Sequence, residues 1–215
     1  MPWLAANDFS RLLRLSVKDL LRVLLGLLYE RDRLISCRAI EALALVVAEG
    51  RKRRPEMARD LIRRLLWSLN DESGGTGWNA PQAIGAIIAT DPAGLAECIP
   101  ILFSFREDPS LTEGVLWGLA AVARARPDLV RPYVLEIGVY LCSPAEQVRA
   151  HAWWVLFNVE PEPVRTVDVA ALSGEIYWRG EMHTPAQLAR LGGKSTSALK
   201  SASIFRGPLA TWVRR

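Results

Sequence analysis

The segment 69–82 holds the side chains best suited to recognising another molecule. It packs three glycines into four residues and places two carboxylates near an indole and two amides. The side chains concerned are Asp71, Glu72, Trp78, Asn79 and Gln82. Glycine permits positive φ angles and close backbone approach, so such a loop folds tightly before the next helix. Two readings follow: a recognition loop that presents these side chains to a partner, or a long turn between helices with a buried tryptophan.

His151 is the first residue to consider for acid–base chemistry. A general base needs a positioned partner within hydrogen-bond reach, and Glu113 occupies the place in its own helix that Arg149 occupies beside His151. The chain carries no Ser-His-Asp arrangement, paired-carboxylate motif or dinucleotide-binding fingerprint. We therefore expect a packed or rim histidine, no catalytic residue, and a protein that is not an enzyme.

Metal and cofactor sites are not expected either. The chain has two histidines and three cysteines, and the cysteines are widely spaced among apolar residues. A closed zinc site needs four nitrogen or sulfur ligands at short spacings. The cysteines are therefore expected to be small buried hydrophobes.

A basic patch follows the second predicted helix. Seven basic residues and two acids lie between positions 51 and 64, a net charge of +5. The patch itself is Arg51, Lys52, Arg53 and Arg54. It is either a solvated turn and helix face or a surface for phosphate or another anionic partner.

Eight tryptophans are the second unusual feature. Trp117 and Trp153 occupy equivalent places in two helices, so both are candidates for an aromatic groove that contacts a partner. Core packing is the alternative, and we expect it for Trp67 and for one of the pair Trp153 and Trp154, which point about 100° apart on a helix. A buried indole also needs a partner for its N–H group.

Helices must position all these residues. Apolar residues recur with helical period over about 16–30, 33–49, 54–70, 79–90, 93–106, 111–125, 129–142 and 145–158. The second helix of each pair is self-similar. The equivalent residues Ile40, Ile84, Trp117 and Trp153 lie 44, 33 and 36 positions apart. Small residues, Ala and Gly, surround these positions and let neighbouring hairpins approach closely. The pattern predicts an all-α chain, an α-solenoid of about four helical hairpins.

Residues 148–156 and 32–43 resemble the second helix of a HEAT repeat. Each has a polar turn, an apolar residue near an Arg, and small residues at helical spacing before a Leu. The two middle repeats lack the Arg. The resemblance covers about residues 16–161. The segment 71–78, with its Asp-Glu-Ser-Gly-Gly run followed by Gly-Trp, in addition resembles a bacterial HEAT family of unknown function. It implies a HEAT/armadillo-like solenoid over 1–165, a curved stack whose second helices line a concave surface that holds a protein, peptide or nucleic acid.

The remainder, 166–215, is expected to be a small irregular extension. Residues 175–184 are typical of a β-hairpin or an extended arm with a tight turn at Arg179 and Gly180. Thr184 is expected to cap a helix that starts at Pro185 and ends at Gly192. Residues 193–203 are small and polar, so we expect the remainder to be a mobile basic tail. Residues 186–215 carry +6 and no acid, so the first 185 residues carry −2 of the total +4.

The N-terminal sequence does not resemble a signal peptide, and the most apolar stretch is too short for a membrane span. We expect a cytoplasmic protein that does not contact a membrane. With 50% hydrophobic and 23% charged residues the chain is neither disordered nor fibrous.

Two functions remain. The first is a non-enzymatic scaffold that binds a protein or peptide through the concave groove and the 71–82 loop. Its expected binding residues are Asp71, Glu72, Trp78, Asn79, Gln82, Glu113, Trp117, Arg149 and Trp153. The alternative is a nucleic-acid-binding HEAT protein that resembles the DNA alkylation-repair glycosylases. It departs from them by carrying Pro81 and Gln82 where a catalytic Asp is wanted, and its middle repeats lack basic residues on their second helices.

Overall fold

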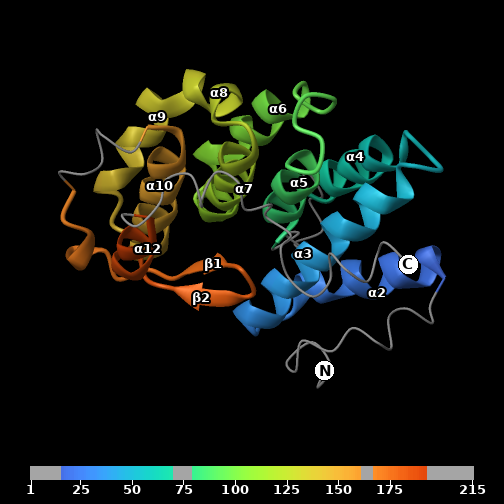
Figure 1. Cartoon of the computed structure of the whole chain (residues 1–215), viewed down its shortest axis with the longest axis horizontal. Coiled ribbons are helices and arrows are strands. Elements are labelled where there is room, and N and C mark those ends of the chain that lie inside the picture. Colours follow the sequence, from blue (N-terminus) through green and yellow to red (C-terminus); the bar gives the residue numbers. More distant parts are fainter. Residues whose placement is uncertain (1–15, 70–78, 161–166, 193–215) are drawn as a thin grey trace.

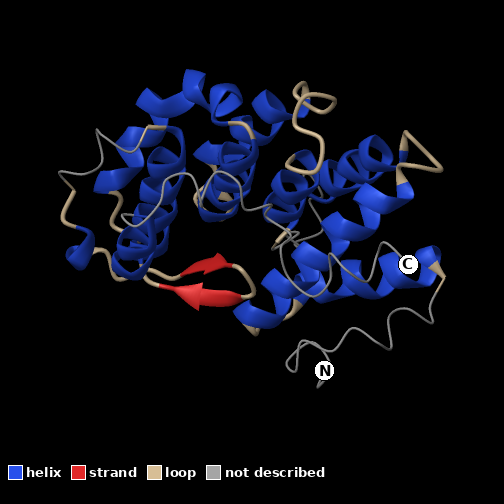
Figure 2. Ribbon diagram, in the orientation of Figure 1, coloured by secondary structure: helices blue, strands red, loops and turns tan. Residues whose placement is uncertain are grey.

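The computed structural model of the chain describes residues 16–69, 79–160 and 167–192, and most of them are helical (Figures 1 and 2). The α-helices are α2 (Val17–Gly26), α3 (Arg33–Gly50), α4 (Met57–Leu69), α5 (Ala80–Ile88), α6 (Cys98–Ser104), α7 (Thr112–Ala125), α8 (Pro127–Val130), α9 (Val134–Gly138), α10 (Glu146–Val159) and α12 (Pro185–Gly192). Short 3-10 turns extend or join them at η2 (Leu27–Tyr29), η3 (Phe105–Glu107), η4 (Arg131–Tyr133), η5 (Val139–Cys142) and η6 (Val169–Ala171). The prediction of a predominantly helical chain is confirmed.

Two predicted helices differ from those in the structure. The sequence predicts one helix over 129–142, whereas the structure divides this stretch into α8, η4, α9 and η5. Pro132 lacks an N–H group and so interrupts the helical hydrogen-bond ladder. The helix predicted over 93–106 begins only at Cys98, because residues 92–97 form turns after Pro92.

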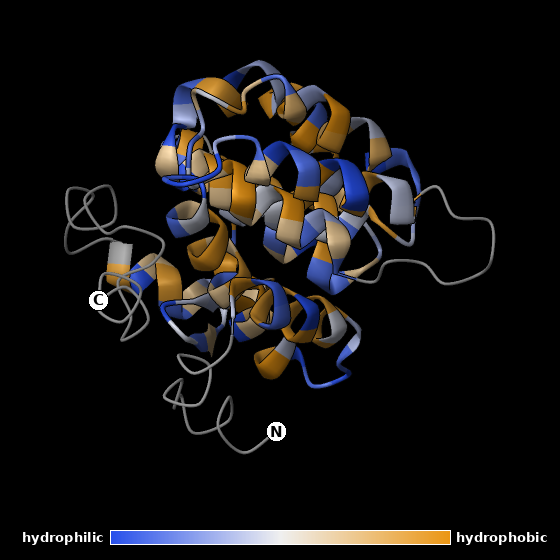
Figure 3. Cartoon of the chain, turned by 90° about the vertical axis from the view of Figure 1, so that its right-hand side faces the viewer, coloured by the Kyte–Doolittle hydropathy of each residue, from blue (hydrophilic) through white to orange (hydrophobic). Residues whose placement is uncertain are grey.

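Four helices form an inner row. α5 packs against α3 and α7, and α7 packs against α10. The helices α4, α6, α8 and α9 lie together on one side of this row (Figure 1). The inner helices supply many of the large, fully buried apolar side chains of the core, among them Ile40, Leu43, Ile84, Ile87 and Leu116. The more peripheral helices carry both hydrophobic and hydrophilic residues, as Figure 3 shows by colour, so one side packs inward and the other meets water.

The closest helix contact is between α5 and α7. A Cβ built on Gly85 would lie 2.1 Å from the Cα of Gly118, which leaves room only for hydrogen at this crossing. Gly85 and Gly118 are also equivalent positions, each following a residue of the repeat alignment. The small residues therefore have the packing role that the sequence predicts for them.

The C-terminal part adds a two-stranded antiparallel hairpin, the only sheet among the described residues. β1 (Ile176–Trp178) pairs with β2 (Glu181–His183), and Trp178 lies opposite Glu181. The turn falls at Arg179 and Gly180, with φ angles of +54° and +85°. Both positive angles fit the two-residue turn whose twist matches a hairpin.

Thr184 then caps α12 in the way the sequence predicts. The Gln187 N–H donates to the Thr184 hydroxyl at 3.3 Å, and the Thr184 N–H donates to the Gln187 side chain at 2.7 Å. This reciprocal pair is a capping box, which fixes the start of the helix. Among the helices of the described ranges, none is both long and apolar enough to cross a membrane.

Candidate functional site

A polar pocket of about 280 Å³ lies where the N-terminal ends of α3, α5 and α7 come together. Its lining includes four of the residues expected from the sequence to bind a partner: Asn79, Gln82, Glu113 and Trp117. Asn79 and Gln82 lie at the start of α5, and Glu113 and Trp117 lie on α7, far from them in the sequence. The pocket also contains residues for which the sequence analysis proposed no binding role: Glu30, Arg31, Arg33, Ser36, Cys37, Ser110 and Gly114.

Gln82 presents an unused hydrogen-bond acceptor at this pocket. Its side chain is 8% exposed, and its Nε2 donates to the Asn79 Oδ1 at 3.0 Å. Asn79 in turn donates to the Leu28 carbonyl at 2.7 Å, which holds the pair in place. The Gln82 Oε1 has no hydrogen-bond partner within the described part of the chain. A buried acceptor without a donor costs about 1–3 kcal/mol. This oxygen is buried against Gly114, so a ligand N–H or O–H group reaches it only when the Gln82 side chain turns into the pocket.

An ion pair joins α3 to α7 at the mouth of the pocket. The Arg33 Nη2 lies 2.6 Å from the Glu113 Oε1, and both side chains are partly exposed, 42% and 33%. The two residues are 80 positions apart. An exposed pair of this kind contributes little to stability, so both charges are available to exchange their partner for a charged or polar ligand group.

The thiol and the imidazole near this pocket are unsuited to catalysis. Burial raises the pKa of the Cys37 thiol to about 12, so the nucleophilic thiolate is absent at neutral pH. Burial also lowers the pKa of His151, although the nearby Glu113 carboxylate acts in the opposite direction. The His151 side chain is 1% exposed, and its Nδ1 lies 2.8 Å from the Gln147 carbonyl. His151 is thus a neutral, packed residue, which is one of the two roles expected from the sequence.

Three of the other expected binding residues cannot be located, because Asp71, Glu72 and Trp78 lie outside the described residues. Arg149 lies away from the pocket and donates to the Ser143 and Pro144 carbonyls at 2.7 and 2.9 Å. It therefore closes the turn before its own helix instead of facing a partner.

Trp153 corrects an expectation. It is 1% exposed and stacks on Trp154 and Phe157, so its indole belongs to the core and is not presented to a partner. Trp154 is buried as well, at 2%. Trp67 was expected in the core, but 79% of the residue is exposed. Helical period identifies a face, but two adjacent indoles can both be buried where a strand packs over the helix.

The hairpin packs over the inner row of helices, which is where the sequence analysis places an open groove (Figure 1). The Tyr177 hydroxyl donates to the Glu41 carboxylate on α3 at 2.5 Å. Arg38, one turn earlier, donates to the Gly180 carbonyl from Nε at 3.2 Å and from Nη2 at 3.0 Å. A cavity of only about 30 Å³ remains between the hairpin and α3, α5, α7 and α10. That volume holds a water molecule, not a peptide.

The groups beneath the hairpin are buried and electrostatically coupled. Burial raises the pKa of Glu41, while the Tyr177 hydrogen bond and the Arg124 and Arg38 charges act to lower it. Burial and the Glu41 charge raise the pKa of Tyr177. Burial lowers the pKa of the Arg124 guanidinium to about 10, so it stays protonated at neutral pH. These residues hold the hairpin on the helices, and the small cavity beneath it is not open to a substrate.

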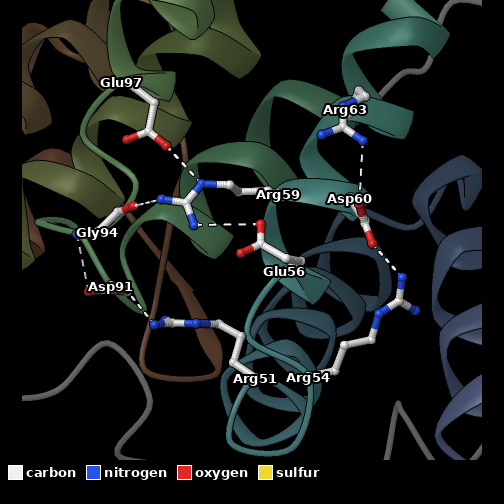
Figure 4. A network of polar contacts seen from close by, with 9 residues as sticks. All are labelled: Arg51, Arg54, Glu56, Arg59, Asp60, Arg63, Asp91, Gly94 and Glu97. Atoms are coloured by element: carbon white, nitrogen blue, oxygen red, sulfur yellow. Dashed lines mark hydrogen bonds and ion pairs between the residues drawn. The ribbon is translucent and has the colours of Figure 1, made fainter.

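Three of the four basic-patch residues are already paired with carboxylates. Arg51 pairs with Asp91 at 2.5 Å, Lys52 with Glu49 at 2.5 Å, and Arg54 with Asp60 at 2.5 Å. Figure 4 shows most of this network, in which Arg51 reaches from the α3–α4 turn to the α5–α6 turn. Arg59 makes a similar link, donating to the Gly94 carbonyl at 2.6 Å and to Glu97 at 3.0 Å. These residues connect neighbouring helical turns.

The sequence does not predict the roles of Arg33, which pairs with Glu113 at the pocket, or of Glu41, which accepts a hydrogen bond from the hairpin. Arg33 lies in the segment that resembles a HEAT helix, but its partner Glu113 is 80 positions away. Glu41 carries one usable signal, since it is an acid placed between the buried residues Ile40 and Ala42. A charged residue on a buried helix face needs a partner, and this was the available clue.

Comparison with known proteins adds a relative that matches part of the chain. An uncharacterized protein of Archaeoglobus fulgidus is 41% identical over 69 residues, which is 32% of this chain and 34% of that protein. The chain thus covers about one third of the length of this relative. No protein-family model matches the chain, and no solved structure matches it. Within the described residues, no group of three His, Cys, Asp or Glu side chains could hold a metal ion.

Proposed function

We propose that this chain is a non-enzymatic, HEAT-like α-solenoid protein of the cytoplasm that binds a protein or peptide partner. The partner binds at the polar pocket between α3, α5 and α7, together with the 71–82 loop, whose last residues form the start of α5. The observation that carries the proposal is an open pocket of about 280 Å³ whose lining combines Arg33, Glu113 and Gln82, the last with an unpaired oxygen buried in the wall.

The chemistry of the pocket favours a peptide over a substrate that must react. Gln82 offers a carbonyl oxygen, Arg33 a guanidinium and Glu113 a carboxylate, so donors and acceptors of both charges meet in one place. Peptides present N–H and C=O groups together with charged side chains, and a pocket of mixed polarity matches them. Trp117 contributes an aromatic wall, of the type enriched at the centres of protein interfaces.

The solenoid assignment rests on the row of α3, α5, α7 and α10 and on the glycine contact between α5 and α7. Repeats that stack through small residues bury a continuous core and leave their helix ends as a surface. The nucleic-acid alternative has weaker support, because Arg51, Lys52 and Arg54 are already paired with carboxylates.

Affinity capture from the native host with matched variants tests the proposal. The first variant is Glu113→Gln, which keeps the shape of the side chain and removes its charge from the pocket. The matched control is Glu136→Gln, because Glu136 also lies 2.6 Å from an arginine, Arg106, and lies outside the pocket. We expect wild type and Glu136→Gln to recover the same protein and Glu113→Gln to recover at least about fivefold less of it.

Equal recovery by all three forms would show that the captured protein does not bind at this pocket. Retention on duplex DNA, measured against salt concentration, addresses the alternative in the same preparations. Phosphate-driven binding weakens steeply as salt rises. Strong, salt-sensitive retention at low salt, together with no captured protein, would replace our proposal with the nucleic-acid function.

A further inference from the structure

A second, larger groove runs between α2 and α4, both of which pack on α3. Its volume is about 880 Å³, and it shares no lining residue with the polar pocket. The floor is apolar and consists of Leu21, Leu25, Met57 and Leu61. Near one end lies Val17, 48% exposed although apolar. A smaller hollow of about 190 Å³ continues the groove, since it shares Leu25, Leu61 and Arg64 with it.

The rim of the groove is strongly basic. Five of its lining residues are cations and only Asp60 is an acid, so the lining carries +4. The cations are Lys18, Arg22, Arg53, Arg54 and Arg64. Asp60 is occupied by ion pairs with Arg54 at 2.5 Å and with Arg63 at 3.4 Å. In the described part of the chain, Lys18, Arg53 and Arg64 have no ion-pair partner, and all three are exposed.

We propose that this groove binds an acidic amphipathic helix of a partner protein. The apolar floor accepts a row of side chains at helical spacing, as in other helix-in-groove complexes. Lys18 and Arg53 or Arg64 then face the acidic residues that flank this row. A flat anionic membrane would not fill a concave groove, and a nucleic acid would leave its apolar floor uncovered. Charge complementarity supplies the choice of partner and speeds association.

The charge of the chain's own ends argues for a separate partner. The side chains of residues 1–15 sum to +1 and those of residues 193–215 to +5, so neither end complements a lining of +4. The segment 70–78 is acidic, with Asp71 and Glu72. This segment is the competing occupant of the groove, and neutralising its two carboxylates distinguishes it from an external helix.

Peptide selection on the full chain tests this inference. A display library of random peptides of about 16 residues, enough for four helical turns, is selected on wild type and counter-selected on Arg53→Glu/Arg64→Glu. We expect the surviving peptides to be acidic, with apolar residues at positions i, i+4 and i+7. In fluorescence anisotropy they should bind Arg53→Glu/Arg64→Glu about tenfold or more weakly and Val17→Ser several-fold more weakly. Arg190→Glu, an exposed arginine on α12, is the control and should leave binding unchanged.

Three results would overturn the inference. The first is a selection that yields no peptide dependent on the rim charges, or yields basic ones. The second is a rise of about tenfold in the affinity of every peptide for Asp71→Asn/Glu72→Gln, which would make the loop the occupant. The third is a dimer in sedimentation analysis that the rim substitutions dissociate, which would make a second copy the occupant. Circular dichroism spectra and melting temperatures must agree among the variants.

Discussion

The Tyr177 hydroxyl lies 2.5 Å from the Glu41 carboxylate and donates a buried hydrogen bond across 136 positions of sequence. This contact ties the C-terminal hairpin to α3, near the opposite end of the helix row from α10. Arg38 reinforces the connection through the Gly180 carbonyl. The hairpin thereby closes the inner helix face and leaves the N-terminal ends of α3, α5 and α7 accessible.

Removing the Tyr177 hydroxyl should therefore destabilise the fold. Tyr177→Phe keeps the ring but leaves the Glu41 carboxylate buried without its donor, so we expect the free energy of unfolding to fall by about 1–3 kcal/mol. Glu41→Gln keeps an oxygen that accepts from Tyr177 but removes the charge that faces the buried Arg124 guanidinium, so it should cost at least as much. Chemical denaturation of the two variants measures both values. An unchanged free energy of unfolding in Tyr177→Phe would contradict the assigned hydrogen bond.

The α5–α7 crossing predicts that methyl groups are not tolerated there. Gly85→Ala places its Cβ against the Gly118 backbone, and the two helices must separate to relieve the overlap. We expect thermal unfolding to show a loss of about 1–3 kcal/mol. Gly138→Ala is the matched control, because a Cβ at this helical position meets nothing within 4 Å. It should stabilise by ~0.5–1 kcal/mol. Destabilisation of similar size in both variants would refute the role of the close approach.

The buried His151 predicts a specific pH dependence of stability. Burial lowers its pKa below the value near 6.5 that it has in the unfolded chain. Between the two values the unfolded state binds more protons, so the free energy of unfolding decreases as pH falls below about 6.5, by at most about 1.4 kcal/mol per pH unit. Above that range this contribution is constant.

Denaturant titrations from pH 7.5 to 5, repeated on His151→Gln, check this expectation. The difference between the two proteins isolates His151 from Glu41, whose raised pKa acts in the opposite direction. A difference that does not change with pH would show that His151 titrates normally in the folded chain.

Cysteine reactivity reports burial directly. Cys37 is 8% exposed and its pKa is raised to about 12, whereas Cys142 is exposed. Because thiolate is the reactive species, iodoacetamide at neutral pH should modify Cys142 rapidly and leave Cys37 unmodified in the folded protein. Mass spectrometry of the digested chain measures both. The same treatment in denaturant should modify both residues, and equal rates in the folded state would be inconsistent with the burial of α3.

Local features of the fold were accessible from the sequence. The helical periods, the small residues at Gly85 and Gly118, the turn at Arg179 and Gly180 and the cap at Thr184 each depend on residues that are close in sequence or equivalent between repeats. Such signals arise from backbone preference and residue spacing, and both can be read from one sequence.

Long-range pairings were not accessible in this way. Nothing near Glu41 indicates that its partner is Tyr177, and nothing near Arg33 indicates Glu113. The hairpin covers the inner helices through long-range pairings of this kind. Local sequence patterns therefore could not show that the expected groove is closed or that Trp153 is buried. Four of the expected binding residues, Asn79, Gln82, Glu113 and Trp117, nevertheless line one pocket, because the N-terminal parts of α5 and α7 lie side by side.

Hydrogen exchange of the chain, alone and with its captured partner, is the most direct test of the polar pocket as the binding site. We predict slower exchange at the N-terminal ends of α5 and α7, at residues 82–85 and 112–116, where the backbone amides surround Gln82 and Glu113. Exchange in α9 and α12 should not change. Protection confined to other helices, with these amides unaffected, would contradict the proposed function.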